Sequence, residues 1–264
     1  MKKNSISMIC MFFLVVVTLF AGNVFAVDEN RDGIYTLGEI VVTGVKSDVE
    51  AVSTIRKVTA QDINQKGAQN LTDVLKMIPG ISIRVGGAGT PRVDIRGFRT
   101  RHVLMLLDGI PINDTYDGQF DPTSFPVEHI AEVKVITGGG SVLYGTGGSG
   151  GVINIITKKG KKGLHGSLGG EVGTEDARRA KITMSGGTDR LDFFVSGSTE
   201  SKDAFPLSDD FNITGEENGD ARENSDFERD SLFANMGYSF SNCTQMGLTL
   251  NRYQGENGVP QRTD

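Results

Sequence analysis

Residues 70–85 read NLTDVLKMIPGISIRV, and this stretch decides the fold of the segment around it. Asn70 and Asp73 have the spacing of a helix cap. The apolar side chains that follow recur with a helical period on one face: Leu71, Val74, Leu75 and Ile78. Pro79 ends this helix, and the next apolar residues alternate with polar ones as in a half-buried strand: Ile81, Ile83 and Val85. The sequence therefore predicts a short helix, buried on one face, that leads directly into a strand.

Similar signals continue on both sides, over residues 51–158. Thr59 and Asp62 form a capping-box pattern that starts an earlier helix, which Gly67 ends. A helical turn is expected at residues 126–130. Further β-prone runs are residues 93–95, 103–107, 133–137 and 152–157. About a hundred residues with two short helices and four or five strands are enough for one small core, so we expect an α+β domain here.

The first 26 residues have the three-part pattern of a secretory signal peptide. Lys2 and Lys3 precede an uncharged apolar run from Ile9 to Phe20, and Ala26 ends a small-x-small cleavage site. The alternative is a membrane-spanning helix, but the run is shorter than the roughly 20 apolar residues that a bilayer requires. We therefore expect residues 1–26 to be removed on export.

Composition narrows the classes of partner and cofactor. The 264-residue chain has 27 Lys+Arg against 33 Asp+Glu, a net charge of -6, so it lacks the basic excess typical of nucleic-acid binding. Cleavage after Ala26 would remove Cys10 and leave Cys243 as the one thiol, which predicts neither an internal disulfide nor a cysteine metal site.

Residues 27–50 are polar except for one short β-prone run, Glu39-Ile40-Val41-Val42-Thr43. In an exposed tail such a run can add as an extra strand to the sheet of another protein, because main-chain hydrogen bonds supply the affinity. The alternative is that this run forms the first strand of the domain that follows it.

From residue 159 onward, apolar and polar residues alternate over five segments. The apolar positions include Leu164, Leu168, Ile182, Met184, Leu191, Val195, Leu232, Met236, Leu248 and Leu250. Segments of about ten residues with this period, separated by turns, are typical of an outer-membrane β-barrel. Residues 187–189 and 242–244 are tight connections, whereas residues 201–229 form a long polar loop, as expected for the two rims of a barrel. The alternative is a secreted β-sandwich with one wet face per sheet.

Five strands cannot close a barrel, which needs about eight. An open edge in lipid would leave unpaired backbone groups, and each of these costs several kcal/mol. We therefore expect residues 159–264 to be the first strands of an incomplete barrel, and the chain to be the front part of a longer protein or a truncated gene product.

Two acidic segments offer the oxygen ligands that Ca²⁺ prefers. Residues 28–39 match the spacing of an EF-hand loop, but a β-prone run rather than a helix follows them. In the loop between residues 201 and 230 the candidate ligands are Asp209, Asp210, Glu216, Glu217 and Asp220. The alternative for both segments is a solvated acidic surface, so no cofactor is predicted apart from this Ca²⁺ hypothesis.

A glycine-rich segment, residues 145–151, matches two enzyme motifs, GxGxxG and GxSxG. Both motifs need a helix to follow them, because its N-terminus binds the phosphate or seats the nucleophile. The residues that follow, 152–157, are β-prone instead, and no catalytic constellation stands out elsewhere. We therefore predict that the protein is not an enzyme.

An ordered set of short motifs covers residues 39–157. They are EIVVTG (39–44), LTDVLKMIPGI (71–81), IRGF (95–98), VLMLLDGIP (103–111), VITG (135–138), VLYG (142–145) and GGVINIIT (150–157). In this order and spacing the chain resembles the TonB-dependent outer-membrane receptors of Gram-negative bacteria. That resemblance implies an α+β plug domain followed by the first antiparallel strands of a large transmembrane barrel.

The resemblance also implies a function and a set of site residues. Glu39–Thr43 looks like the TonB box, the strand that binds the periplasmic domain of TonB, and uptake of a metal chelate, a ferric siderophore or cobalamin, would be energised through it. The candidate ligand contacts in the plug loops are Arg92, Tyr116 and Phe120. Arg96 and Arg99 would lock the plug against carboxylates of the barrel. The competing hypothesis is a secreted calcium-binding or adhesive β-rich protein.

Overall fold

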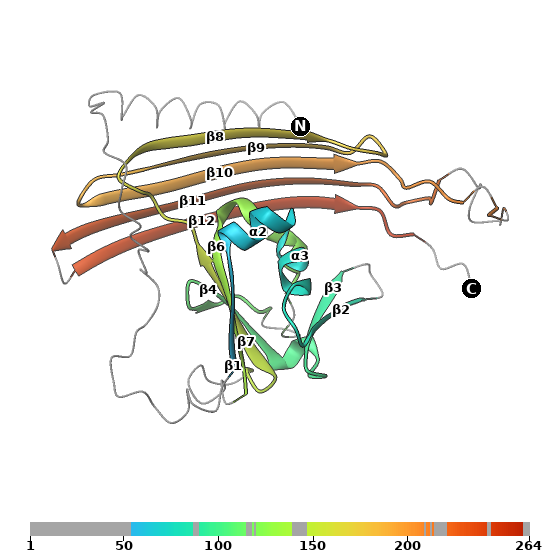
Figure 1. Ribbon diagram of the computed structural model, residues 1–264, viewed down its shortest axis with the longest axis horizontal. Helices are drawn as coiled ribbons and strands as arrows, with labels where there is room; N and C mark the ends of the chain where they lie inside the picture. The colour runs from blue at the N-terminus through green and yellow to red at the C-terminus, as the bar shows by residue number, and fades with distance from the viewer. Residues whose placement is uncertain are drawn as a thin grey trace. The chain divides into compact units, whose positions relative to one another are not determined.

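The computed structural model describes residues 54–86, 90–114, 118, 120–138, 147–208, 210–211, 213, 221–241 and 244–260. Residues 54–158 form an α+β domain, and residues 163–257 contain five long strands that form one sheet, here called the wall (Figure 1). In the described part of the chain no helix is long and apolar enough to cross a membrane.

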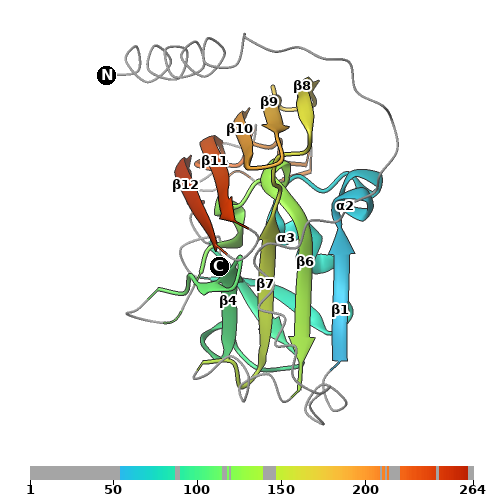
Figure 2. The ribbon, with the colours of Figure 1, turned by 90° about the vertical axis from the view of Figure 1, so that its left-hand side faces the viewer.

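The central sheet of the α+β domain has the strand order β1-β6-β7-β4-β5 (Figure 2). Its strands are β1 (Thr54–Thr59), β4 (Val103–Leu107), β5 (Ile110–Pro111), β6 (Ile130–Thr137) and β7 (Gly151–Thr157). β4 and β7 run parallel, and the other neighbours are antiparallel. A separate hairpin consists of β2 (Ile81–Val85) and β3 (Pro91–Ile95). The predicted α+β class is therefore confirmed.

Both predicted helices form, with the predicted caps. In α2 (Ala60–Lys66) the Thr59 side chain accepts a hydrogen bond from the Asp62 N–H, and the Asp62 carboxylate accepts one from the Thr59 N–H at 2.9 Å. Gly67 ends this helix with a φ of 66°, a left-handed conformation that suits glycine. In α3 (Leu71–Lys76) the cap is Asn70. Three short 3-10 helices complete the domain: η1 (Thr100–His102), η2 (Pro122–Ser124) and η3 (Val127–His129).

The predicted face of α3 lies in the core. Leu71, Val74 and Leu75 are fully buried, and they belong to one cluster with residues of β3, β4, β6 and β7. Val85 differs from expectation, because it is 75% exposed at the far end of the β2–β3 hairpin, beyond the reach of this core. The amphipathic pattern therefore identified the buried helix face but extended the buried face of β2 too far.

The wall is an antiparallel meander with the order β12-β11-β10-β9-β8. Its strands are β8 (Gly163–Val172), β9 (Arg178–Gly187), β10 (Leu191–Lys202), β11 (Phe227–Ser241) and β12 (Thr244–Asn257). Residues directly opposite one another share a face, and one such row is apolar: Met184, Val195, Ala234 and Leu250. The next row on the other face is Ser167, Thr183, Ser196, Phe233 and Asn251. The predicted division into an apolar and a more polar face is confirmed.

Candidate functional site

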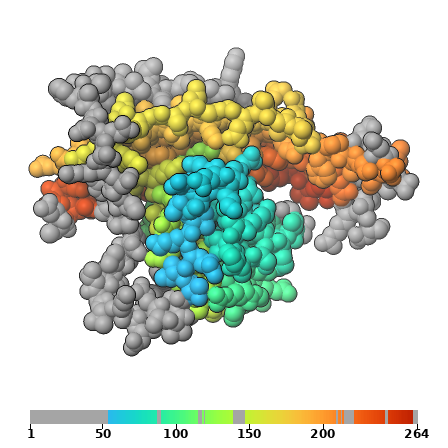
Figure 3. Space-filling view, in the orientation of Figure 1, coloured from blue at the N-terminus to red at the C-terminus, as the bar shows by residue number. Residues whose placement is uncertain are grey.

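The α+β domain lies against one face of the wall (Figure 3), and the wall residues that contact it, Arg179 and Asn235, belong to the more polar face. One cross-strand row on this face has alternating charge: Glu171 on β8, Arg179 on β9, Glu200 on β10 and Arg229 on β11. Neighbours in such a row are close enough to interact, so opposite charges stabilise the sheet. The row also places two guanidinium groups on the face that meets the α+β domain.

Arg179 joins the wall to the α+β domain through a buried ion pair. Its Nη2 donates to Glu128 Oε1 at 2.7 Å and to the Gln69 carbonyl oxygen at 3.0 Å. The side chains of Arg179 and Glu128 are only 6% and 5% exposed. Because a buried charge is costly without its partner, this pair holds η3 and the loop before α3 in a fixed position against β9.

A second contact connects β11 to the turn after β4. Asn235 Nδ2 donates to Thr157 Oγ1 at 3.0 Å, and that hydroxyl donates to Asp108 Oδ2 at 2.6 Å. Asp108 Oδ1 also accepts from the Thr157 N–H at 2.9 Å. Asn235 and Thr157 are both buried. Asn235 of the wall therefore adds a buried hydrogen bond to the Thr157–Asp108 network of the α+β domain.

A third contact is aromatic. The His129 ring, which is 0% exposed, stacks on Phe233 of β11 with ring centroids 4.5 Å apart and meets Phe125 edge-on at 5.6 Å. Burial, and to a smaller extent the charge of Lys158, together lower the pKa of His129 from 6.5 to about 3. His129 is therefore a neutral, apolar-like ring at neutral pH.

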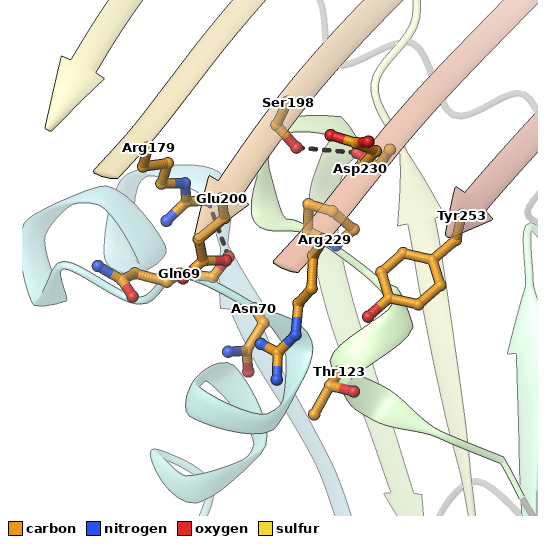
Figure 4. A pocket seen from close by; sticks show the side chains of 11 residues that line it. Gln69, Asn70, Thr123, Arg179, Ser198, Glu200, Arg229, Asp230 and Tyr253 are labelled. Atoms are coloured by element: carbon orange, nitrogen blue, oxygen red, sulfur yellow. Dashed lines mark hydrogen bonds between the residues drawn. The ribbon is translucent and has the colours of Figure 1, made fainter. Parts of the chain in front are cut away.

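Two cavities lie beside these contacts. The larger, of about 470 Å³, is bounded by the Asn64–Gln69 segment, Glu128, Lys158 and the polar faces of β8 and β9. The smaller, of about 10 Å³, has room for one water molecule. Figure 4 shows Arg229 and Tyr253 pointing from the wall towards Asn70 and Thr123 around this smaller cavity.

The residues predicted to contact a ligand lie on different elements. Arg92 is half-buried on β3, and its side chain lies over Gly86. Phe120 packs on the core, with its ring 5.3 Å from that of Phe125. No hydrogen bond or ring contact joins Arg92 to Phe120 within the described residues, and Tyr116 lies outside them.

The predicted lock arginines are exposed in the structure. The Arg96 N–H donates to the Gly80 carbonyl oxygen at 2.8 Å, and Arg99 precedes η1. In the described part of the chain, the ion pair between the domain and the wall has the opposite polarity, because the carboxylate comes from the domain and the arginine from the wall. A role for Arg96 and Arg99 against other carboxylates stays a prediction.

The remaining predicted sites lie mostly outside the described residues. This holds for Glu39–Thr43 and for four of the five candidate Ca²⁺ ligands, namely Asp209, Glu216, Glu217 and Asp220. The fifth, Asp210, is exposed. Within the described ranges there is no group of three or more His, Cys, Asp or Glu side chains that could hold a metal ion.

Comparison with known proteins places this arrangement in a family. The family model described as "TonB-dependent Receptor Plug Domain" matches residues 47–152, which include all the elements of the α+β domain up to the start of β7. The chain belongs to the TonB-dependent receptors. Its α+β domain is the plug, and the wall follows the plug in the chain.

Curated relatives of this TonB-dependent receptor are named for two kinds of ligand. The chain is 33% identical over 215 residues to the vitamin B12 transporter BtuB of Vibrio vulnificus, covering 79% of this chain and 34% of that protein. It is 28% identical over 201 residues to the ferric enterobactin receptor PirA of Pseudomonas aeruginosa, covering 67% of this chain and 27% of that protein. The chain thus spans about a third or less of the length of these relatives.

Solved structures of receptors share the fold. The siderophore receptor PirA from Acinetobacter baumannii has a TM-score of 0.63 and 22% identity, covering 80% of this chain and 32% of that one. The pyoverdine outer membrane receptor FpvA from Pseudomonas aeruginosa also has a TM-score of 0.63, with 20% identity, 76% coverage of this chain and 27% of that one. The arrangement of plug and first wall strands is therefore that of known receptors.

Proposed function

We propose that this TonB-dependent receptor takes up a scarce metal chelate, a ferric siderophore or cobalamin, across the outer membrane. The observation that carries the proposal is the plug fold packed by buried contacts against the polar face of the wall. The other face carries exposed apolar side chains such as Leu168 (83% exposed) and Leu250 (55%), as a lipid-facing surface requires. The relatives include both a ferric enterobactin receptor and a vitamin B12 transporter, which supports both chelate classes.

The proposed energy source is TonB, which binds Glu39–Thr43 as an added strand. A pull on that segment enters the described part of the chain at Thr54, the first residue of β1. β1 is an edge strand that pairs with β6 alone, through six residue pairs, and Val58 is its one buried side chain. The strand on which TonB would pull first, β1, is therefore paired on one side only.

The proposed ligand contacts are Arg92, Tyr116 and Phe120. A cationic side chain and aromatic rings suit an anionic ferric catecholate, whereas cobalamin would use the aromatic and polar groups more than the charge. The loop between β10 and β11, with its acidic residues, would bind Ca²⁺ beside the ligand. We place the mature protein in the outer membrane after removal of residues 1–26.

The first experiment measures binding of the purified C-terminal domain of TonB to the whole chain. We compare the natural sequence with Val41→Pro, because proline removes one N–H from the added strand and restricts its backbone. A matched control, Asp48→Pro, places the same residue outside the box. We expect at least a tenfold loss of affinity for Val41→Pro only. Equal binding by all three chains, or no binding by any, would contradict the proposal.

The second experiment distinguishes the two chelate classes. Source cells that lack the gene, and cells that carry it, are compared for uptake of radiolabelled ferric enterobactin and radiolabelled cyanocobalamin. Arg92→Gln is expected to lower uptake of the ferric catecholate and to leave uptake of cobalamin unchanged. Uptake of neither compound in gene-carrying cells would contradict the substrate assignment while leaving TonB binding intact.

A further inference from the structure

His129 has an unusual environment for a histidine at an interface. Both ring nitrogens are buried, and neither has a hydrogen-bond partner in the described structure. Other polar groups nearby form hydrogen bonds across the same interface, Glu128 Oε1 with Arg179 Nη2 and Thr157 Oγ1 with Asn235 Nδ2, although Glu128 Oε2 and Arg179 Nε are also buried without a partner. His129 thus contributes packing alone, while keeping a group that can take up a proton.

Of the charged groups around His129, Lys158 opposes a positive charge on the ring, and the Glu128 carboxylate already pairs with Arg179. Lys158 follows β7, and its backbone N–H donates to the His129 carbonyl oxygen at 2.8 Å; its ammonium disfavours protonation of the ring. Glu128 on η3 is already paired with Arg179 of β9. The wall residues around Phe233 on the same face are uncharged: Phe194 and Ser196 on β10, Asn235 on β11 and Asn251 on β12.

We propose that His129 is a pH-sensitive latch between the plug and the wall, closed while the ring is neutral and released when the ring is protonated. The released state lets the imidazolium reach water by separating its ring from Phe233. This inference concerns the described residues only and requires neither TonB binding nor ligand uptake. It therefore stands or falls independently of the proposed function.

The direction of the pH effect follows from the two states of the ring. In the closed state the pKa of His129 is about 3, and in the open, hydrated state it has the ordinary value of 6.5. The open state therefore binds the proton first as pH falls. The contact is fully stable above pH 6.5 and weakens between pH 6.5 and 3. The equilibrium constant for opening rises about tenfold per pH unit in this range, or roughly a hundredfold between pH 7.5 and 4.5.

The absence of tryptophan from the sequence gives a direct reporter. The chain contains no Trp, so Phe233→Trp would place a single indole against His129. We would follow the fluorescence of the whole chain in detergent from pH 7.5 to 3.5. Opening exposes the indole to water and shifts its emission to longer wavelength. The expected result is a reversible shift that begins near pH 6.5 and grows as the pH falls to 3.5.

The matched control is the double variant Phe233→Trp with His129→Gln, in which Glu128, Lys158 and Arg179 are retained. We expect its emission to stay constant over the same range, because glutamine does not titrate. An identical transition in both variants would assign the effect to the carboxylates and overturn the proposal. A flat signal in the variant that keeps His129 would overturn it as well.

Hydrogen exchange provides a test without a change at Phe233. Exchange rates are measured at pH 7.5 and 4.5 and corrected for the intrinsic rate at each pH. The natural chain is expected to lose protection in residues 125–131 and 229–237 at the lower pH. Residues 81–95, in the separate β2–β3 hairpin, serve as an internal control. His129→Phe, which keeps the ring but not its basicity, is expected to abolish the loss. An equal loss in His129→Phe would contradict the latch.

Discussion

Replacement of Arg179 by methionine tests how strongly the wall holds the plug. The change leaves the Glu128 carboxylate, which is 5% exposed, without its partner in a buried site. Removing one member of a buried ion pair costs about 3 to 5 kcal/mol, because the remaining charge stays desolvated. The hydrogen bond to the Gln69 carbonyl oxygen is lost as well. We therefore expect Arg179→Met to lower the free energy of unfolding by about 3 to 5 kcal/mol.

Arg178→Met is the matched control on the neighbouring position of β9. Arg178 pairs with Asp176, but both side chains are more than 60% exposed, at 68% and 62%. Exposed pairs of this kind contribute between zero and about 1 kcal/mol. The two substitutions are chemically identical and differ only in the face of the strand, so the difference between them isolates the contact with the plug.

The single variant Glu128→Gln and the double variant Glu128→Gln/Arg179→Met complete the cycle. The double variant removes both charges, so the desolvation cost of an unpaired carboxylate disappears and only the lost hydrogen bonds remain, worth about 1 kcal/mol each. We expect it to be more stable than Arg179→Met alone. The assay is urea unfolding of the whole chain in detergent, followed by circular dichroism. If Arg178→Met and Arg179→Met were equally stable, or if the two changes in the double variant were additive, the buried pair would not hold the plug.

Two further predictions concern other parts of the chain. A Cβ at Gly150 would lie 2.6 Å from the Phe98 Cβ and 3.0 Å from the His102 carbonyl oxygen, so Gly150→Ala is expected to cost about 1 to 3 kcal/mol in the same assay. Gly166→Ala, where the nearest atom is at 3.5 Å, is its control and should change stability far less. Calorimetry is expected to detect Ca²⁺ binding to the natural chain but not to the variant Glu216→Gln/Glu217→Gln. An unchanged isotherm in the variant would show that the acidic loop is not the binding site.

The sequence predicts those features of the fold that depend on local periodicity. The caps at Thr59 and Asn70 and the buried face of α3 are encoded within single segments, as is the two-residue period of the wall strands. β1 was not among the expected strands, since it has only one buried side chain, Val58, and is held by its pairing with β6, more than 70 residues later. Its stability is tertiary rather than local.

Contacts between the plug and the wall are harder to predict for the same reason. The pattern of β9 places Arg179 on the polar face, but nothing in the local sequence selects Glu128, 51 residues earlier, as its partner. The expected polarity, plug arginines against wall carboxylates, is reversed in the contact that the structure describes. His129 gave no signal as a functional residue, because an isolated histidine in a sequence does not reveal that both its nitrogens are buried and unpaired.

The position of this interface bears on how the proposed pull from TonB would act. β1 and β6 are antiparallel, with Thr54 opposite Thr137 and Thr59 opposite Glu132. Force that enters at Thr54 therefore acts first on the pair with Thr137, at the C-terminal end of β6. His129 and Glu128 immediately precede the other end of β6, where the plug is held to the wall. β1 would separate before the force reaches the latch, so traction can remodel one edge of the plug while η3 stays bound to the wall. A lower pH would weaken the contact between His129 and Phe233, which the force reaches last.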